Sequence, residues 1–136
     1  MNAIEIVKRA NTAYNAHDAD ALAALYADDA SYSNPRAGQG VTGKASVNFP
    51  KAVWAAYPDA FVELISVGDT GEGLVALQWV LRGTNTGKLS DGTPATGRTV
   101  TLPGAAFIRV ESDKICWEQI YYDRQNLSEQ LGLKAK

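Results

Sequence analysis

The sequence predicts a single α+β domain in which helices come first and an antiparallel sheet follows. Apolar residues recur at helical spacing up to about residue 57, whereas β-branched and aromatic residues gather in short runs after it. The connections at 69–71 and 112–113 are too short for a crossover helix and suit antiparallel neighbours. A length of 136 residues without internal repeats is usual for one domain. We therefore expect one domain over 1–136, with the N-terminal helices packed on the sheet.

The N-terminal part contains the signals that begin and interrupt helices. The predicted helices cover 3–16, 19–27 and 43–56. Asn2 followed by Glu5 fits an N-cap with its partner, and either Asp18 or Asp20 can cap the second helix. Pro50 indicates that the third helix is kinked or begins late.

The strands are predicted from runs of β-forming residues bounded by turn residues. A short strand at 30–33 precedes a loop at 34–40, and long strands cover 60–68, 74–85, 97–110 and 114–123. Gly104 follows Pro103 inside a predicted strand, which indicates a bulge or a sharp bend. A sheet curved in this way encloses a cavity, so we expect a pocket between sheet and helices.

Composition and charge exclude several classes of function. The formal net charge is −2 and there is no basic run, which argues against binding to nucleic acid. Cys116 is the single cysteine and no Cys or His cluster has metal-ligand spacing, so we expect neither a disulfide framework nor a metal. Charged residues interrupt 1–30, which predicts no signal peptide and no membrane span. A cytoplasmic protein with an uncharged or weakly polar ligand is expected.

Several short motifs follow one another in an order that is typical of one family. They are Ala27-Asp28-Asp29-Ala30, Tyr57-Pro58-Asp59, Gly83-Thr84-Asn85-Thr86-Gly87, Thr96-Gly97-Arg98, Asp113-Lys114-Ile115 and Gln130-Leu131-Gly132. Together they resemble the SnoaL-like polyketide cyclase family of the nuclear transport factor 2-like, or cystatin-like, superfamily over about 5–133. The resemblance implies a cone-shaped, usually dimeric fold with a cofactor-free pocket in which a carboxylate serves an intramolecular aldol closure. The sheet face that the helices leave uncovered would then form a homodimer.

The resemblance places the family's acid/base carboxylate at Asp123, at the end of the last predicted strand. Strict alternation puts Trp117, Gln119 and Tyr121 on the same face as Asp123. An aspartate among aromatic rings would lose solvation, which raises its pKa and suits it to proton transfer near neutral pH. The same side chain can instead cap a final helix or pair with Arg124.

The predicted substrate-binding residues carry aromatic or amide side chains. They are Tyr32, Asn34, Trp54, Trp79, Gln119 and Tyr121. Aromatic residues at such spacing serve equally well as core, and Asn34 can either donate to a ligand carbonyl or hold its own loop by an Asx turn.

Departures from the family's pattern weaken the cyclase interpretation. The family's helper histidine near 105–109 is missing, and the single histidine, His17, lies in a predicted turn. Asn34 also stands where ketosteroid isomerase, a related enzyme, carries its aspartate base, which excludes that route. Epoxide hydrolysis of the limonene type needs an Asp-Arg-Asp set, of which Asp123 and Arg109 could be two members, but the interior pattern offers no third carboxylate.

Two functions therefore remain in view. The first is a SnoaL-like enzyme, a cyclase or a related lyase or isomerase, that acts on a small hydrophobic carbonyl compound by acid/base catalysis. The second is a non-catalytic module or dimeric scaffold that binds a metabolite. An Asp123 inside an open cavity would favour the enzyme, and a capped or solvent-facing Asp123 the scaffold.

Overall fold

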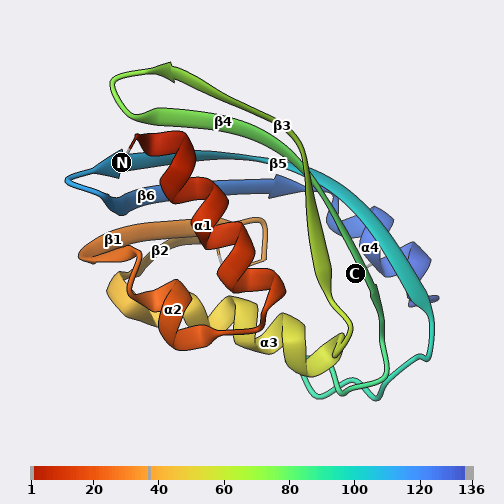
Figure 1. Cartoon of the computed structure of the whole chain (residues 1–136). Coiled ribbons are helices and arrows are strands. Elements are labelled where there is room, and N and C mark those ends of the chain that lie inside the picture. The colour runs from red at the N-terminus through yellow and green to blue at the C-terminus, as the bar shows by residue number, and fades with distance from the viewer. Residues whose placement is uncertain (1, 37, 134–136) are drawn as a thin grey trace.

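A computed structural model describes residues 2–36 and 38–133, with the backbone alone for 38–40. Most helices precede the main strands, and the strands join in one curved sheet (Figure 1), which confirms the predicted α+β fold. Helix α1 (Ala3–Asn15) begins as predicted, because the Asn2 side chain accepts the backbone N–H of Glu5. Helix α2 (Ala19–Ala23) is capped by Asp18 and ends earlier than predicted.

Residues 26–42 differ most from the sequence prediction. The short strand expected at 30–33 is the longer β1 (Tyr26–Asn34), and the expected loop contains β2 (Gly38–Thr42), which pairs with β1 antiparallel. Aspartates and glycines are depleted in strands, so the sequence pattern predicts β1 too short and does not predict β2. The 3₁₀ helix η1 (Gly43–Val47) then leads into α3 (Asn48–Ala56). Pro50 lies in the first turn of α3, where its missing N–H costs no helical bond, so the late start is confirmed.

The four long strands form as predicted. They are β3 (Phe61–Gly71), β4 (Leu74–Thr84), β5 (Thr99–Glu111) and β6 (Lys114–Tyr122), and each pairs antiparallel with the next. The described strands lie in the order β2-β1-β6-β5-β4-β3. One expectation needs correction, because β1 runs parallel to β6. Connection lengths within 60–123 indicate only how neighbours in the chain pair. Strands β1 and β6 are adjacent in the sheet, but β2 to β5 lie between them in the chain.

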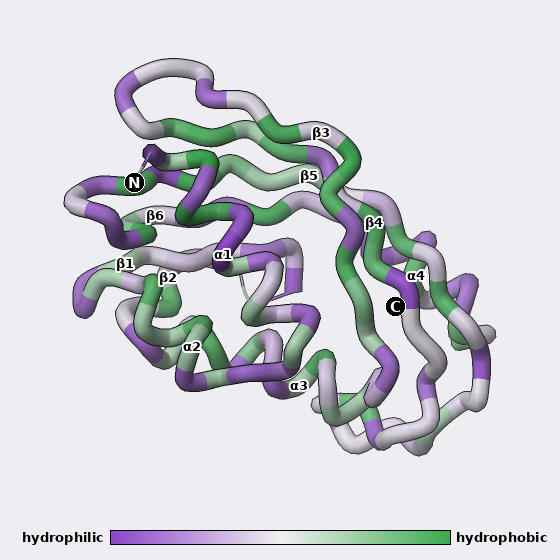
Figure 2. Tube along the Cα trace, in the orientation of Figure 1, coloured by the Kyte–Doolittle hydropathy of each residue, from purple (hydrophilic) through white to green (hydrophobic). Residues whose placement is uncertain are grey.

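The helices and the sheet enclose two separate hydrophobic clusters among the described residues. Helices α1, α2 and α3 lie along one face of the curved sheet, and α4 (Arg124–Gln130) lies at its bent end (Figure 1). One cluster joins α1 to the inner sheet face through residues such as Ile6, Val75 and Ile115. The other joins the end of α3 to α4 through residues such as Ala56 and Leu131. Figure 2 shows the hydrophobic run along β4 that contributes to both.

Of the two features predicted at Gly104, a bulge or a sharp bend, the bulge is absent. The β4–β5 ladder keeps its register through Pro103 and Gly104, so no bulge lies there. A Cβ on Gly104 would lie 2.1 Å from Cζ2 of Trp79, the residue with which it pairs. The glycine therefore leaves room for the indole ring of Trp79.

The Gly-Thr-x-Thr-Gly motif serves the fold through Asn85. The Asn85 side chain is fully buried, and its Nδ2 donates to the carbonyl oxygens of Ala56 and Gly87. Its Oδ1 accepts from both the backbone N–H and the hydroxyl of Thr96. The amide thus ties the end of α3 to the connection between β4 and β5.

Candidate active site

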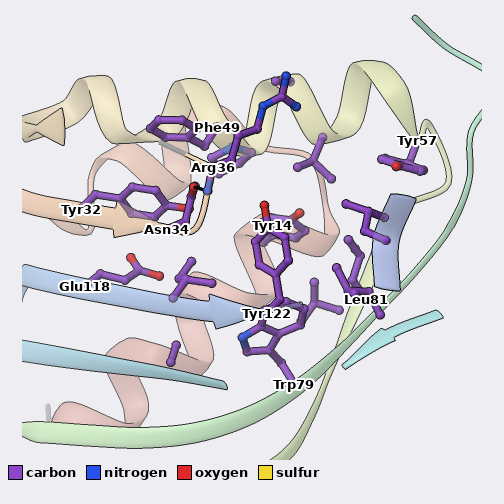
Figure 3. A pocket seen from close by; sticks show the side chains of 18 of the residues that line it. Tyr14, Tyr32, Asn34, Arg36, Phe49, Tyr57, Trp79, Leu81, Glu118 and Tyr122 are labelled. Carbon is purple, nitrogen blue, oxygen red and sulfur yellow. Dashed lines mark hydrogen bonds between the residues drawn. The ribbon is translucent and has the colours of Figure 1, made fainter. Parts of the chain in front are cut away.

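A cavity of about 720 Å³ lies between the two hydrophobic clusters. Residues of α1, β1, α3, α4 and the inner face of the sheet line it, and most of the wall is apolar. The volume is within the range usual for small-molecule sites. The pocket predicted from the curved sheet is therefore present (Figure 3).

Glu118 on β6 supplies the buried carboxyl group of this cavity. The side chain lines the wall and is 8% exposed, and Oε1 accepts the hydroxyl of Tyr26 from β1. Loss of solvation raises the pKa of Glu118 from 4.5 to about 7, although the bond from Tyr26 acts in the opposite direction. Near neutral pH this carboxyl can therefore both take and give a proton.

Tyr32 and Asn34 belong to β1, lie beside Glu118 of β6 and line the cavity as predicted. Burial raises the pKa of Tyr32, and the nearby Glu118 raises it further, so the phenol stays neutral and can donate a hydrogen bond. Nδ2 of Asn34 lies 3.3 Å from the Tyr32 hydroxyl, and Oδ1 accepts the backbone N–H of Arg36 at 2.9 Å. Asn34 thus both faces the cavity and holds its own loop, so the two interpretations of this residue are compatible.

Further phenol groups continue along the cavity wall. Tyr14, Tyr57 and Tyr122 come from different elements, and Figure 3 shows Tyr57 at the opposite end from Glu118. Burial raises the pKa of Tyr14 and Tyr122 and raises that of Tyr57 to about 12, so all three are neutral at physiological pH. Trp79 lines the cavity as predicted and meets the Tyr122 ring edge to face, with 6.3 Å between centroids.

Trp54 does not line the cavity, which corrects its predicted place. Its indole ring stacks on His17 with 5.1 Å between centroids and meets Tyr14 edge to face at 5.6 Å. His17 Nε2 in turn lies 2.9 Å from the carbonyl oxygen of Ala60. The Trp54 side chain thus joins α3 to the turn after α1, and Val53, its neighbour in the chain, lines the cavity.

Asp123 lies outside the cavity wall, so its predicted position is wrong. The carboxylate is exposed and caps α4, where Oδ1 accepts the backbone N–H groups of Gln125 at 2.9 Å and of Asn126 at 3.1 Å. The alternative interpretation from the sequence, a cap for the final helix, describes this geometry. For Asp123 alone, this outcome favours the non-catalytic scaffold over the enzyme.

Gln119 and Tyr121 lie on the outer face of the sheet, which also corrects their predicted places. The register shows that β5 pairs Val110 with Ile115 and Arg109 with Trp117, so Cys116 is an extra residue in β6. This bulge reverses the alternation after it, and the inner residues become Glu118, Ile120 and Tyr122. Trp117 and Tyr121 are accordingly exposed on the far side.

Glu118 is a candidate functional residue that the sequence analysis missed. A glutamate between Trp117 and Gln119 resembles an outward-facing charge when the aromatic residues are assigned to the inside. The sequence carries no signal for this, because only the pairing with β5 shows that Cys116 is an extra residue that turns Glu118 inward.

No helix in the described part of the chain is long and apolar enough to cross a membrane. Within the same residues no group of three or more His, Cys, Asp or Glu side chains is placed to hold a metal ion.

Comparison with solved structures places the fold. A protein of Jannaschia sp. CCS1 that is proposed to be a SnoaL-like polyketide cyclase superposes with a TM-score of 0.85 at 18% identity, over 98% of this chain and 93% of that one. IdmH of Streptomyces antibioticus, a proposed polyketide cyclase, gives 0.82 at 24% identity, over 98% of this chain and all (100%) of that one. AclR of Streptomyces galilaeus, a proposed hydroxylase, gives 0.83 at 20% identity, over 96% of this chain and 80% of that one.

At these identities the superpositions establish the fold alone. Other similar structures are described as having a cystatin fold and a ketosteroid isomerase-like fold, in agreement with the cone-shaped architecture. A search of curated proteins found no significant match. The sequence model of the SnoaL-like domain family matches residues 7–118, which is most of the chain. The chain therefore belongs to the SnoaL-like domain family.

Proposed function

We propose that the protein is a SnoaL-like enzyme that acts on a small hydrophobic carbonyl compound by acid/base catalysis without a cofactor, with Glu118 as the proton carrier. The observation that carries this proposal is the carboxyl group of Glu118, which is buried on the wall of an apolar cavity and has a pKa raised to about 7. A group with this pKa divides between its two protonation states at neutral pH, as proton transfer in both directions requires. Glu118 thus takes the role that the family resemblance assigned to Asp123.

The neighbouring side chains suit the remaining parts of such a reaction. The Glu118 carboxylate removes a proton from the carbon beside a carbonyl group, and the neutral phenol of Tyr32 donates to the enolate oxygen that forms. In an intramolecular aldol closure the enolate carbon then bonds to a second carbonyl carbon, whose oxygen takes the proton back from Glu118. Asn34 orients the substrate beside Tyr32, and Trp79 offers a flat wall to an unsaturated ring.

Isotope exchange tests this proposal without knowledge of the natural substrate. In D₂O the protein should accelerate exchange of the α-protons of 2-tetralone, a hydrophobic ketone, above the buffer rate as measured by NMR. Glu118→Gln keeps the shape of the side chain but removes the proton acceptor, so exchange should fall by about a hundredfold or more.

Asp123→Asn is the matched control and should retain the exchange activity, because Asp123 lies away from the cavity wall. Binding of 2-tetralone without any exchange by the wild-type chain would instead favour the alternative, a non-catalytic protein that holds a small molecule.

The proposal includes a homodimer formed through the outer face of the sheet and a cytoplasmic location. Phe107, Trp117 and Tyr121 are exposed together on neighbouring strands of that face, and the rings of Phe107 and Tyr121 meet edge to face at 6.3 Å. Exposed aromatic clusters of this kind favour association, and a second copy with the same patch satisfies two-fold symmetry.

A further inference from the structure

The opening of the cavity carries a local excess of positive charge. Among the described residues that line the cavity, the charged ones are Arg36, Asp91, Glu118 and Arg124. Arg36, Asp91 and Arg124 are exposed, which places them at the opening, whereas Glu118 is buried inside. Two guanidinium groups against one carboxylate leave the opening positive, although the whole chain has a formal net charge of −2.

The two arginines come from separate elements, and both line the same cavity. Arg36 follows β1, where its backbone N–H is held by Asn34, and Arg124 is the first residue of α4. Both lower the pKa of the Tyr122 hydroxyl, against the larger effect of burial, so both act at this point of the wall. Neither forms an ion pair with any residue in 2–36 or 38–133. Their charge is therefore available to a ligand.

The two ends of the cavity differ in what they accept. Glu118 is buried inside the cavity, whereas Arg36 and Arg124 are exposed at its opening, so the cations lie away from the buried carboxyl. An anionic group beside Glu118 would be desolvated and repelled by the ionised carboxylate. The same group at the opening would gain charge-assisted hydrogen bonds from guanidinium groups and keep part of its hydration.

We propose that the substrate is an amphipathic acid, with an apolar body in the cavity, its reacting carbonyl at Glu118 and a carboxylate at the opening bound by Arg36 and Arg124. This inference rests on the proposed function in taking the cavity as the substrate site. It adds the charge of the substrate and the direction in which it enters. The sequence analysis expected an uncharged or weakly polar ligand, and the apolar wall supports that only for the inner part.

A pair of fluorescent probes with the same aromatic body tests the anion site. The probes are 8-anilinonaphthalene-1-sulfonate and its uncharged counterpart N-phenyl-1-naphthylamine, and fluorescence titration gives both affinities. The wild-type chain should bind the sulfonate about tenfold more tightly than the uncharged probe, a difference of about 1.4 kcal/mol in binding free energy. Decanoate should displace either probe at lower concentration than 1-decanol, which extends the preference to a carboxylate.

The double variant Arg36→Gln/Arg124→Gln should lose the preference to within about twofold while the uncharged probe keeps its affinity. Lys8→Gln/Arg82→Gln is the matched control, because both side chains lie away from the cavity wall and their loss removes the same two positive charges. Equal affinities for the two probes in the wild-type chain, or a preference that survives in the double variant, would overturn the inference. Failure of both probes to bind would overturn it too.

The outcome can be separated from the proposed catalysis. A chain that prefers the anionic probe but fails to exchange the protons of 2-tetralone retains the anion site and loses the proposed function. A chain that exchanges those protons through Glu118 without any preference for the anion does the reverse.

Discussion

The buried carboxyl of Glu118 links the stability of the folded chain to pH. Its pKa is about 7 in the folded chain against an ordinary 4.5, so between these values the folded state holds a proton that the unfolded state releases. Stability should therefore fall as pH rises from about 4.5 to 7 and stay lower above it. At about 1.4 kcal/mol for each pKa unit, the loss is about 3 kcal/mol.

Glu118→Gln should remove this dependence, since the amide oxygen can still accept from Tyr26 and does not ionise. Urea unfolding at pH 5 and pH 8 measures the effect: the variant should gain on the wild type by about 2 to 3 kcal/mol at pH 8 compared with pH 5. The exposed Glu63→Gln is the control and should show a smaller change. A stability difference between Glu118→Gln and wild type that is the same at both pH values would contradict the assigned pKa.

At the scale of elements, α4 depends on its cap. Asp123 satisfies two backbone N–H groups at the start of this helix, and Leu127 and Leu131 of the helix and the turn after it line the cavity. Asp123→Ala should therefore lower the free energy of unfolding by about 1 kcal/mol. Asp123→Asn should lose less, because asparagine is also a good N-cap. Chemical denaturation of the two variants and the wild type measures the difference, and equal stability of all three would count against the capping role.

Residue patterns could predict some of the residues that line the cavity, but not which residues of β6 face it. Tyr32 and Asn34 alternate on a strand whose position the turn residues indicate, and the bulky Trp79 lies in a hydrophobic run, so all three were assigned to the cavity. In β6 the extra residue Cys116 reverses the alternation, and no residue type marks it. Tertiary pairing decides this register, so the sequence led to Asp123 where the fold presents Glu118.

The elements themselves show the same division. Helix α1 and the strands β3 to β6 follow local signals, namely a cap, periodicity and turns, and the sequence predicts them. Strand β1 contains Asp28 and Asp29, which disfavour a strand, and it forms because β2 and β6 supply hydrogen-bond partners on both sides. Such pairing depends on distant residues, which local patterns do not contain.

At the scale of the whole molecule, the outer sheet face should determine association. If Trp117 and Tyr121 lie at the centre of a homodimer, the double variant Trp117→Glu/Tyr121→Glu places like charges across the two-fold axis and should convert dimer to monomer. Light scattering coupled to size exclusion measures the mass at micromolar concentration. Thr12→Glu on the exposed side of α1 is the control and should stay dimeric. A wild-type chain that is monomeric at this concentration would remove the proposed dimer.

The pairing of β1 with β6 also orders events in time. Tyr26 and Glu118 are 92 positions apart, and β6 lies between β1 and β5 in the sheet. The β1–β2 hairpin therefore has no place in the sheet until the last strand has arrived, and closing so long a loop makes this step slow. A chain still emerging from the ribosome without β6 leaves one edge of β5 unpaired and Tyr26 without its acceptor. Glu118, the proposed proton carrier, thus gains its partner Tyr26 only in the final step of folding.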